Sequence, residues 1–373
     1  MESNGSLKSR YDNRKEECNL KKQTRIEWVD IGKYICIMFV MATHLSYCPS
    51  SLRTFFTPFF LPLFFFLSGY VYKNNSTFGD FVVKKVRTLL VPWFIFSLLI
   101  IITGQIMSFN EHTSLKEELV GMFLQIRGKD DTMWFVVCLF VAFIPFYFII
   151  RYMQRRVGII VAFILSSISI IYCQFMNAEL LPWKSAALPW HIQTIFVAML
   201  LMMAGYYFKL DYEKKFARFV NIRTFFIALV VYLGLIYIEY FITGRSLGIN
   251  EYGKVFFIYW YLTVASGIVL CIIISKLVKP NKYISFVGAN TLTYFGLHGK
   301  LEGLVEKLLS SAGILNKIYN SVLLQYILCI FTIIVISVVL IIPAMIINRY
   351  FPFVLGKWYK KNIDKRLTYK VDM

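Results

Sequence analysis

The 373-residue sequence is poor in charge, and above all in acidic residues. Asp, Glu, Lys and Arg make up 16% of the chain, and only 21 residues are acidic against 40 Lys and Arg. Soluble globular proteins carry about 25% charged residues. This low charged fraction excludes an ordinary soluble protein of this size, and we expect no soluble domain at either end.

Metal-binding and disulfide motifs are also missing. The seven cysteines are scattered, mostly within apolar stretches, and none forms a C-x-x-C pair. Their spacing predicts neither structural zinc nor a disulfide framework, and we expect no metal cofactor. Residues 1–26 contain no apolar segment like that of a signal peptide, so we expect them to form a polar cytosolic tail.

Apolar residues, by contrast, are abundant. They make up 58% of the chain and include 35 Phe and 24 Tyr. A run of about 20 such residues can cross the hydrocarbon core of a bilayer as a helix. The sequence predicts an all-α, polytopic transmembrane bundle, with a membrane domain at 27–348 and a basic cytosolic tail at 349–373. Ten spans are expected, at 31–47, 55–72, 89–107, 132–150, 157–174, 190–208, 224–243, 255–275, 284–299 and 322–347.

The Lys and Arg residues alternate along these spans. Most of them lie before the first span, after the last, and in the loops 73–87, 151–156, 209–223 and 276–282. Such a bias marks cytosolic segments in membrane proteins. It predicts that both termini are cytosolic, and it explains the net charge of +19 without a nucleic-acid partner.

One outer loop has helical periodicity. Leu115, Leu119, Met122 and Phe123 recur at helical spacing between charged residues. This pattern predicts a short amphipathic helix at the outer membrane surface, with membrane lipid against its apolar side.

The first span contains two ionisable residues in an otherwise apolar segment, Lys33 and His44. Eleven residues are about three helical turns, so both side chains fall on one face, roughly 16 Å apart along the axis. Lys33 could extend to the cytosolic headgroups or bind a ligand. His44 could form a structural hydrogen bond between helices, or act as a general base if it faces a cavity.

Two later motifs have both a structural and a functional interpretation. Ser68 and Gly69 are small residues that allow close helix packing. Lys84, Lys85 and Arg87 are topology determinants by default, but they could also hold phosphate at the inner membrane face.

Aromatic and polar residues near the outer ends of the spans give weaker signals. Trp134 is typical of an interfacial aromatic belt, and His191 of a structural boundary residue, while His112 lies in a charged loop and has the weakest case. The ninth span is too polar to face lipid. It should line a cavity, with Tyr294 and His298 among its polar residues.

Six segments, taken in order, carry a family resemblance. The first is "VDIGKYICIMFVMATH", with Asp30, Lys33 and His44, and the others are "FFFLSGYVYK", "KKVRTLLVPW", "MWFV", "AGYYFKL" and "ANTLTYFGLHG". Over residues 24–350 the chain resembles the acyltransferase-3 family of polytopic membrane O-acyltransferases, and within it the fucose 4-O-acetylase-like group. It departs from the usual pattern with Lys33 in place of Arg and with Tyr34 beside it, and we expect no appended extracellular SGNH-type esterase domain.

The resemblance implies an activity and a set of ligands. The donor would be acyl-CoA, most often acetyl-CoA, and the acceptor a hydroxyl of a cell-surface or lipid-linked carbohydrate. The implied location is the bacterial cytoplasmic membrane, and polysaccharide-assembly machinery or a second copy of the chain would be a partner.

The resemblance also implies roles for residues. His44 would act as general base or carry the acyl group as a covalent relay, with His298 as the second catalytic residue. Lys33, Lys84, Lys85 and Arg87 would bind the phosphates of coenzyme A. The remaining candidates, for substrate binding, are Asp30, Ser68, Trp134 and Tyr294.

Two other classes of function remain open from the residues alone. A transporter or flippase of a glycan precursor or small solute would use His44 and His298 as a proton relay. A non-catalytic scaffold in polysaccharide assembly would need neither histidine.

Overall fold

The computed structural model of the chain describes residues 26–107, 114–125, 133–175, 187–244, 246–249 and 257–357. These residues form helices and contain no strand, which confirms the predicted all-α class. Most of the two expected tails, residues 1–25 and 358–373, and also His112, lie outside the described residues.

The helices follow one another through short connections. In chain order they are α2 (Glu27–His44), α3 (Ser50–Phe56), α4 (Phe60–Tyr70), α5 (Phe78–Lys85), η1 (Val86–Leu90), α6 (Val91–Met107), α7 (Leu115–Leu124), α8 (Trp134–Tyr152), α9 (Arg155–Phe175), η3 (Pro189–His191), α10 (Ile192–Tyr207), η4 (Phe208–Tyr212), α11 (Glu213–Phe216), η5 (Ala217–Phe219), α12 (Ile222–Thr243), α13 (Phe257–Leu277), α14 (Lys282–Ala289), α15 (Thr291–Ser311), α16 (Leu315–Tyr319), α17 (Val322–Val339), α18 (Ile341–Tyr350) and η6 (Pro352–Leu355).

Among the described residues, eight helical stretches are long and apolar enough to cross a membrane. The expected spans at 31–47 and 284–299 are not among them. The first is a single helix, α2, but Glu27, Asp30 and Lys33 lower its apolarity. The second is divided at Asn290 into α14 and α15, and α15 continues to Ser311, so the predicted end at residue 299 is wrong.

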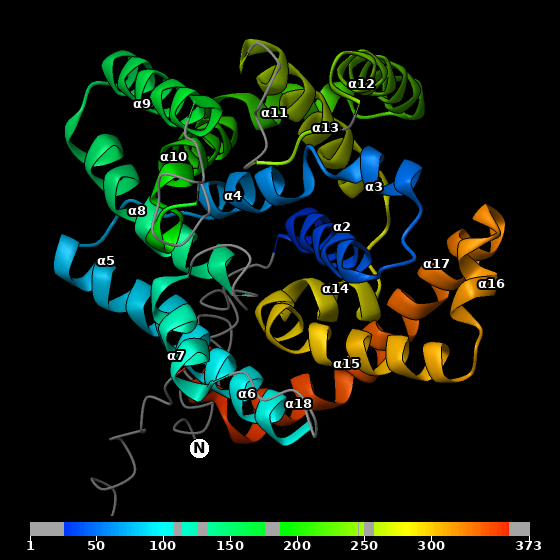
Figure 1. Cartoon of the computed structure of the whole chain (residues 1–373). Helices are drawn as coiled ribbons and strands as arrows, with labels where there is room; N and C mark the ends of the chain where they lie inside the picture. The colour runs from blue at the N-terminus through cyan, green and yellow to red at the C-terminus, as the bar shows by residue number, and fades with distance from the viewer. Residues whose placement is uncertain are drawn as a thin grey trace, which may run out of the picture.

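Helix α2 lies in the middle of the bundle. It packs against α4, α13, α14, α15 and α17, and Figure 1 shows it surrounded by these elements. A central helix faces protein rather than lipid, so ionisable side chains on it can be solvated by other polar groups or by a cavity. This position explains how the first expected span can carry two ionisable residues, Lys33 and His44.

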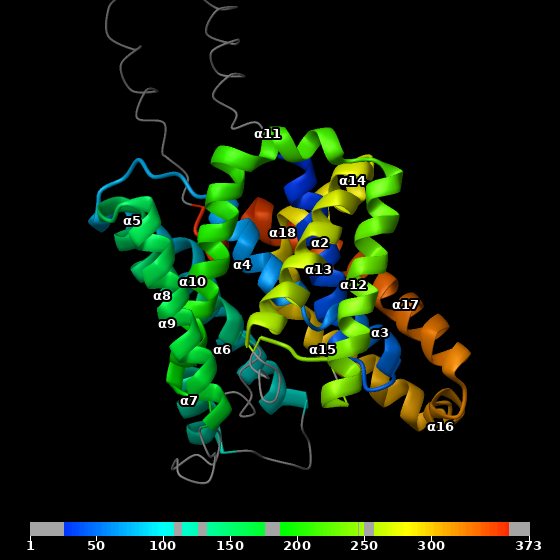
Figure 2. The ribbon, with the colours of Figure 1, turned by 90° about the horizontal axis from the view of Figure 1, so that it is seen from above.

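The two ends of the bundle can be told apart in Figure 2, where α5 and α11 lie at one end and α7 and α16 at the other. We call these the inner and the outer end, after the orientation that the Lys and Arg distribution predicts. Helices α5 and α11, from two loops predicted to be cytosolic, share one end, and α7 and α16, from two loops predicted to be on the outside, share the other (Figure 2). Which end faces the cytosol remains a prediction from the charges.

The packing of α4 on α10 depends on two glycines. A Cβ atom on Gly69 would lie 1.9 Å from the carbonyl oxygen of Met202, and one on Gly205 would lie 1.9 Å from that of Phe66. The two backbones therefore touch, which small residues permit in membrane helices. The packing interpretation of the "LSG" segment is correct for Gly69.

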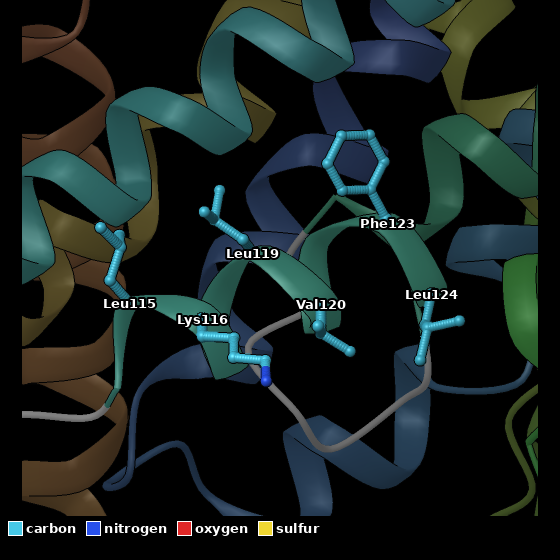
Figure 3. A pocket seen from close by; sticks show the side chains of 6 residues that line it. All are labelled: Leu115, Lys116, Leu119, Val120, Phe123 and Leu124. Carbon is cyan, nitrogen blue, oxygen red and sulfur yellow. The ribbon is translucent and has the colours of Figure 1, made fainter.

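The expected outer-surface helix is present as α7. Its side chains line an apolar groove of about 540 Å³, and Figure 3 shows Leu119 and Phe123 pointing to one side of the helix and Lys116 and Val120 to the other. Val120 and Phe123 are exposed. Exposed apolar side chains at the end of a membrane bundle suit burial at the boundary between headgroups and acyl chains.

Candidate active site

The outer end of α2 is held in place by several hydrogen bonds. The helix ends at His44, where Leu45 turns to an extended conformation. Beyond it, the backbone N–H of Ser46 donates to Oε1 of Glu306 (2.6 Å), and Nη2 of Arg53 donates to the carbonyl of Leu45 (3.1 Å). These contacts fix the position of His44 relative to α15, which carries Glu306.

The two catalytic candidates meet at this end. The ring centroids of His44 and His298 lie 5.0 Å apart, with the rings inclined at 65°. His44 is exposed, whereas His298 is 2% exposed. The structure thus brings together two histidines that are far apart in the sequence, one buried and one accessible.

The hydrogen bond of His298 fixes how its ring can act. Its Nδ1 lies 3.0 Å from the carbonyl oxygen of Tyr294. Because a carbonyl oxygen only accepts, Nδ1 must carry the proton, and the neutral ring then presents the lone pair of Nε2. In the described part of the chain Nε2 has no hydrogen-bond partner. His298 can therefore accept a hydrogen bond or a proton, but in its neutral form it cannot donate from Nε2.

Glu302 joins this pair and was missed by the sequence interpretation. It lies one turn after His298 on α15, is 2% exposed, and neither carboxylate oxygen has a partner among the described residues. One potential metal-ligand atom from each of His44, His298 and Glu302 lies within 4.8 Å of the other two. The i, i+4 spacing of His298 and Glu302 was visible in the sequence, but the predicted span ended at residue 299 and left Glu302 in a loop.

At the inner end, the structure gathers part of the expected basic cluster. The charge of Lys85 on α5 is close enough to those of Lys84 and of Lys33 on α2 to be repelled by both. Its Nζ also lies 3.2 Å from the ring centroid of Phe143, which offers the cation the negative face of an aromatic ring. Lys84 and Arg87 are exposed.

Two of the expected substrate-binding hydroxyls are engaged within the bundle. The Ser68 hydroxyl donates to the carbonyl of Phe64 in its own helix (2.8 Å), and the Tyr294 hydroxyl donates to the carbonyl of Ser337 on α17 (2.8 Å). Asp30 is buried, and its main chain lies against α14, where a Cβ on Gly288 would be 2.0 Å from the Asp30 carbonyl oxygen. Tyr294 does reach the histidine pair, but through its backbone carbonyl, which accepts from Nδ1 of His298, and not through its hydroxyl.

Trp134 lies in a separate aromatic group at the outer end. It is the first residue of α8, and its ring is 4.3 Å from that of His191, at an angle of 33°. His191 and Trp190 both have left-handed backbone conformations, with φ of 52° and 56°. The Trp190 indole donates to the carbonyl of Phe123 on α7 (2.6 Å), so this strained turn ties α7 to the bundle.

A second polar centre, at the inner end, was also missed. Glu213 of α11 accepts hydrogen bonds from the Trp28 indole (3.1 Å), the Tyr70 hydroxyl (2.6 Å) and the Lys276 ammonium (2.9 Å). These donors come from α2, α4 and α13, respectively. One carboxylate thus joins three helices at the end of α2 that carries Lys33.

Glu213→Ala is expected to lower the free energy of unfolding by about 1.5–3 kcal/mol, because it leaves three donors without their acceptor. The matched control is Asp211→Ala, which removes a single exposed ion pair with Arg155 (2.6 Å) and should change stability by about 0–1 kcal/mol. Thermal unfolding of the detergent-purified variants measures both. Equal effects would contradict the proposed role of Glu213 as a junction.

Fold and site together define a multi-pass membrane protein with an ionisable centre at the end of its central helix. The acyltransferase-3 family model, described as an acyltransferase domain, matches residues 26–342. The chain therefore belongs to this family and is a membrane acyltransferase. No curated protein and no solved structure gives a significant match.

Proposed function

We propose that this acyltransferase moves an acetyl group from cytosolic acetyl-CoA to a hydroxyl of a cell-surface or lipid-linked glycan in a bacterial cytoplasmic membrane. Within the family, we assign it to the fucose 4-O-acetylase-like group on the strength of the six sequence segments quoted above. The observation that carries the proposal is the pairing of His44 with His298, whose ring centroids lie 5.0 Å apart. His44 lies at one end of α2, and Lys33 lies toward the other end of the same helix.

The donor is assigned to the inner end by charge. Coenzyme A is polyanionic, and the side chain of Lys85 lies close enough there to those of Lys33 and Lys84 to interact with both electrostatically. Phosphate groups are bound by such clusters through charge-assisted hydrogen bonds. From Lys33 to His44 the helix rises by roughly 16 Å, a length that the extended pantetheine arm can follow.

The chemistry follows from the two histidines. His44 takes the proton of the acceptor hydroxyl while the hydroxyl oxygen attacks the thioester carbonyl. The C–S bond then breaks, and the proton passes from His44 to the departing thiolate. His298 offers only a lone pair at Nε2, so it orients the acceptor hydroxyl or the His44 ring and does not stabilise the oxyanion. The variant in which His44 itself carries the acyl group uses the same geometry.

The assay that tests the proposal is acetyl transfer in proteoliposomes. Purified protein supplied with acetyl-CoA should release free CoA when an acceptor glycan is present, and the surface glycan of a deletion strain should lose one acyl mass relative to the parent. If labelled glycan crosses the bilayer and no CoA is ever released, the protein is a transporter and the proposal is wrong.

Lys33→Ala is expected to raise the KM for acetyl-CoA by about tenfold or more, since one charge-assisted contact to phosphate is worth about 1.5–3 kcal/mol. The KM for the acceptor should change little. Lys279→Ala, which removes an exposed lysine at the same end, is the matched control. An unchanged KM for acetyl-CoA would contradict phosphate binding by Lys33 and leave it only as a determinant of membrane topology.

A further inference from the structure

His44, His298 and Glu302 together make a set of donors that suits a transition metal. Two imidazole nitrogens and one carboxylate oxygen, from α2 and α15, lie within 4.8 Å of one another. Zinc sites of the His₂Glu kind use these three groups and leave a fourth position open. The set was invisible to spacing rules, because α2 and α15 are distant in the sequence.

The unpaired atoms give a second and independent reason. Nε2 of His298 and both oxygens of Glu302 are buried without a hydrogen-bond partner in the described residues. An isolated carboxylate is expensive to bury unless a cation or a proton neutralises it. Glu306, one turn further along α15, lies close enough to Glu302 to add its own negative charge. Arg53, which donates to the Leu45 carbonyl, places a positive group near the end of α2.

The geometry is close to what zinc requires. With ligand distances of about 2.0–2.2 Å, the donors of a tetrahedral site lie about 3.4 Å apart. The three donor atoms lie within 4.8 Å of one another, so no pair has to close by more than about 1.4 Å. His44 is the last residue of its helix and is exposed, and rotation of its side chain can supply this movement. The exposed side of His44 leaves the fourth position to water.

We propose that His44, His298 and Glu302 bind one Zn²⁺ ion, reached from the outer end of the bundle. Imidazole ligands favour zinc over Mg²⁺ and Ca²⁺, which prefer oxygen donors. On the function proposed above, the bound ion occupies the lone pair that His44 needs as a base. Zinc is therefore an inhibitor of acyl transfer rather than a cofactor.

Zn²⁺ binding to the purified full-length protein tests the site directly. Competition with a chelating dye should give one ion per chain, and Glu302→Gln and His298→Ala should each weaken the affinity by about 100-fold. Glu239→Gln is the matched control, because Glu239 is also buried and has one unpartnered oxygen, but lies on α12. Equal affinity in the wild type and in Glu302→Gln would overturn the site and assign a proton to Glu302 instead.

A protection experiment on the unmodified protein avoids variants that fail to fold. Zn²⁺ should slow the reaction of diethyl pyrocarbonate with His44 and His298, read as modified peptides by mass spectrometry, and Mg²⁺ should not. Zinc that protects neither histidine overturns the proposal.

Activity separates this inference from the proposed function. Zn²⁺ should inhibit acyl transfer, and a chelator should restore it. If zinc binds, protects both histidines and still leaves transfer intact, the site stands and the role of His44 as base is wrong.

Discussion

His44→Ala is expected to reduce acyl transfer by about 10²- to 10⁴-fold, the usual contribution of a positioned general base. The residue is exposed at the end of α2, so its side chain contributes little to packing and the variant should fold. The loss should therefore appear in kcat, with the protein's thermal unfolding and its KM for acetyl-CoA little changed. Transfer in membranes or proteoliposomes supplied with acetyl-CoA is the measurement.

The matched control is a histidine that, unlike His44, lies outside the apolar spans. His112→Ala should retain wild-type activity, because the sequence places it in a charged loop. His298→Ala should also lose activity, since His298 contacts the His44 ring. Wild-type transfer by His44→Ala would remove both the base and the acyl-histidine mechanism. A labelled acyl group trapped on the wild-type protein, and absent from His44→Ala, would favour the covalent relay.

Gly205→Ala and Gly69→Ala are expected to have the largest effects on stability. At each position the new Cβ would fall 1.9 Å from a carbonyl oxygen of the facing helix, and those are backbone atoms that cannot rotate away. The helices α4 and α10 would have to separate. Overpacking costs about 1–3 kcal/mol where side chains can adjust, and we expect about 3 kcal/mol or more here. The folded fraction recovered in detergent should fall sharply.

A glycine on α12 that faces open space provides the control. A Cβ on Gly234 of α12 meets no atom within 4 Å. Gly234→Ala should therefore be neutral or stabilising by up to about 1 kcal/mol, the helix-propensity difference between the two residues. Thermal unfolding of all three variants decides the matter. If Gly205→Ala unfolds at the wild-type temperature, the two backbones are not in contact.

The sequence by itself determined the class of protein and the main features of its central helix. Hydrophobic periodicity and length are local properties, so they predicted the helical bundle, the outer helix α7 and the continuous helix from Lys33 to His44. The small residue Gly69 indicated a close helix contact for the same reason. The motifs also identified His298 as a polar residue that faces the interior.

What only the tertiary structure decided is which side chains meet. Glu302 completes the histidine cluster and Glu213 joins three helices, and each has partners on helices that are distant in the sequence. Ser68 and Tyr294 looked available in the sequence, but both hydroxyls donate to backbone carbonyls, that of Ser68 within its own helix and that of Tyr294 on the neighbouring helix α17. A polar group in a membrane protein binds whatever the neighbouring helices bring within reach. That set is fixed by the packing of distant segments, which hydropathy and spacing along one chain do not record.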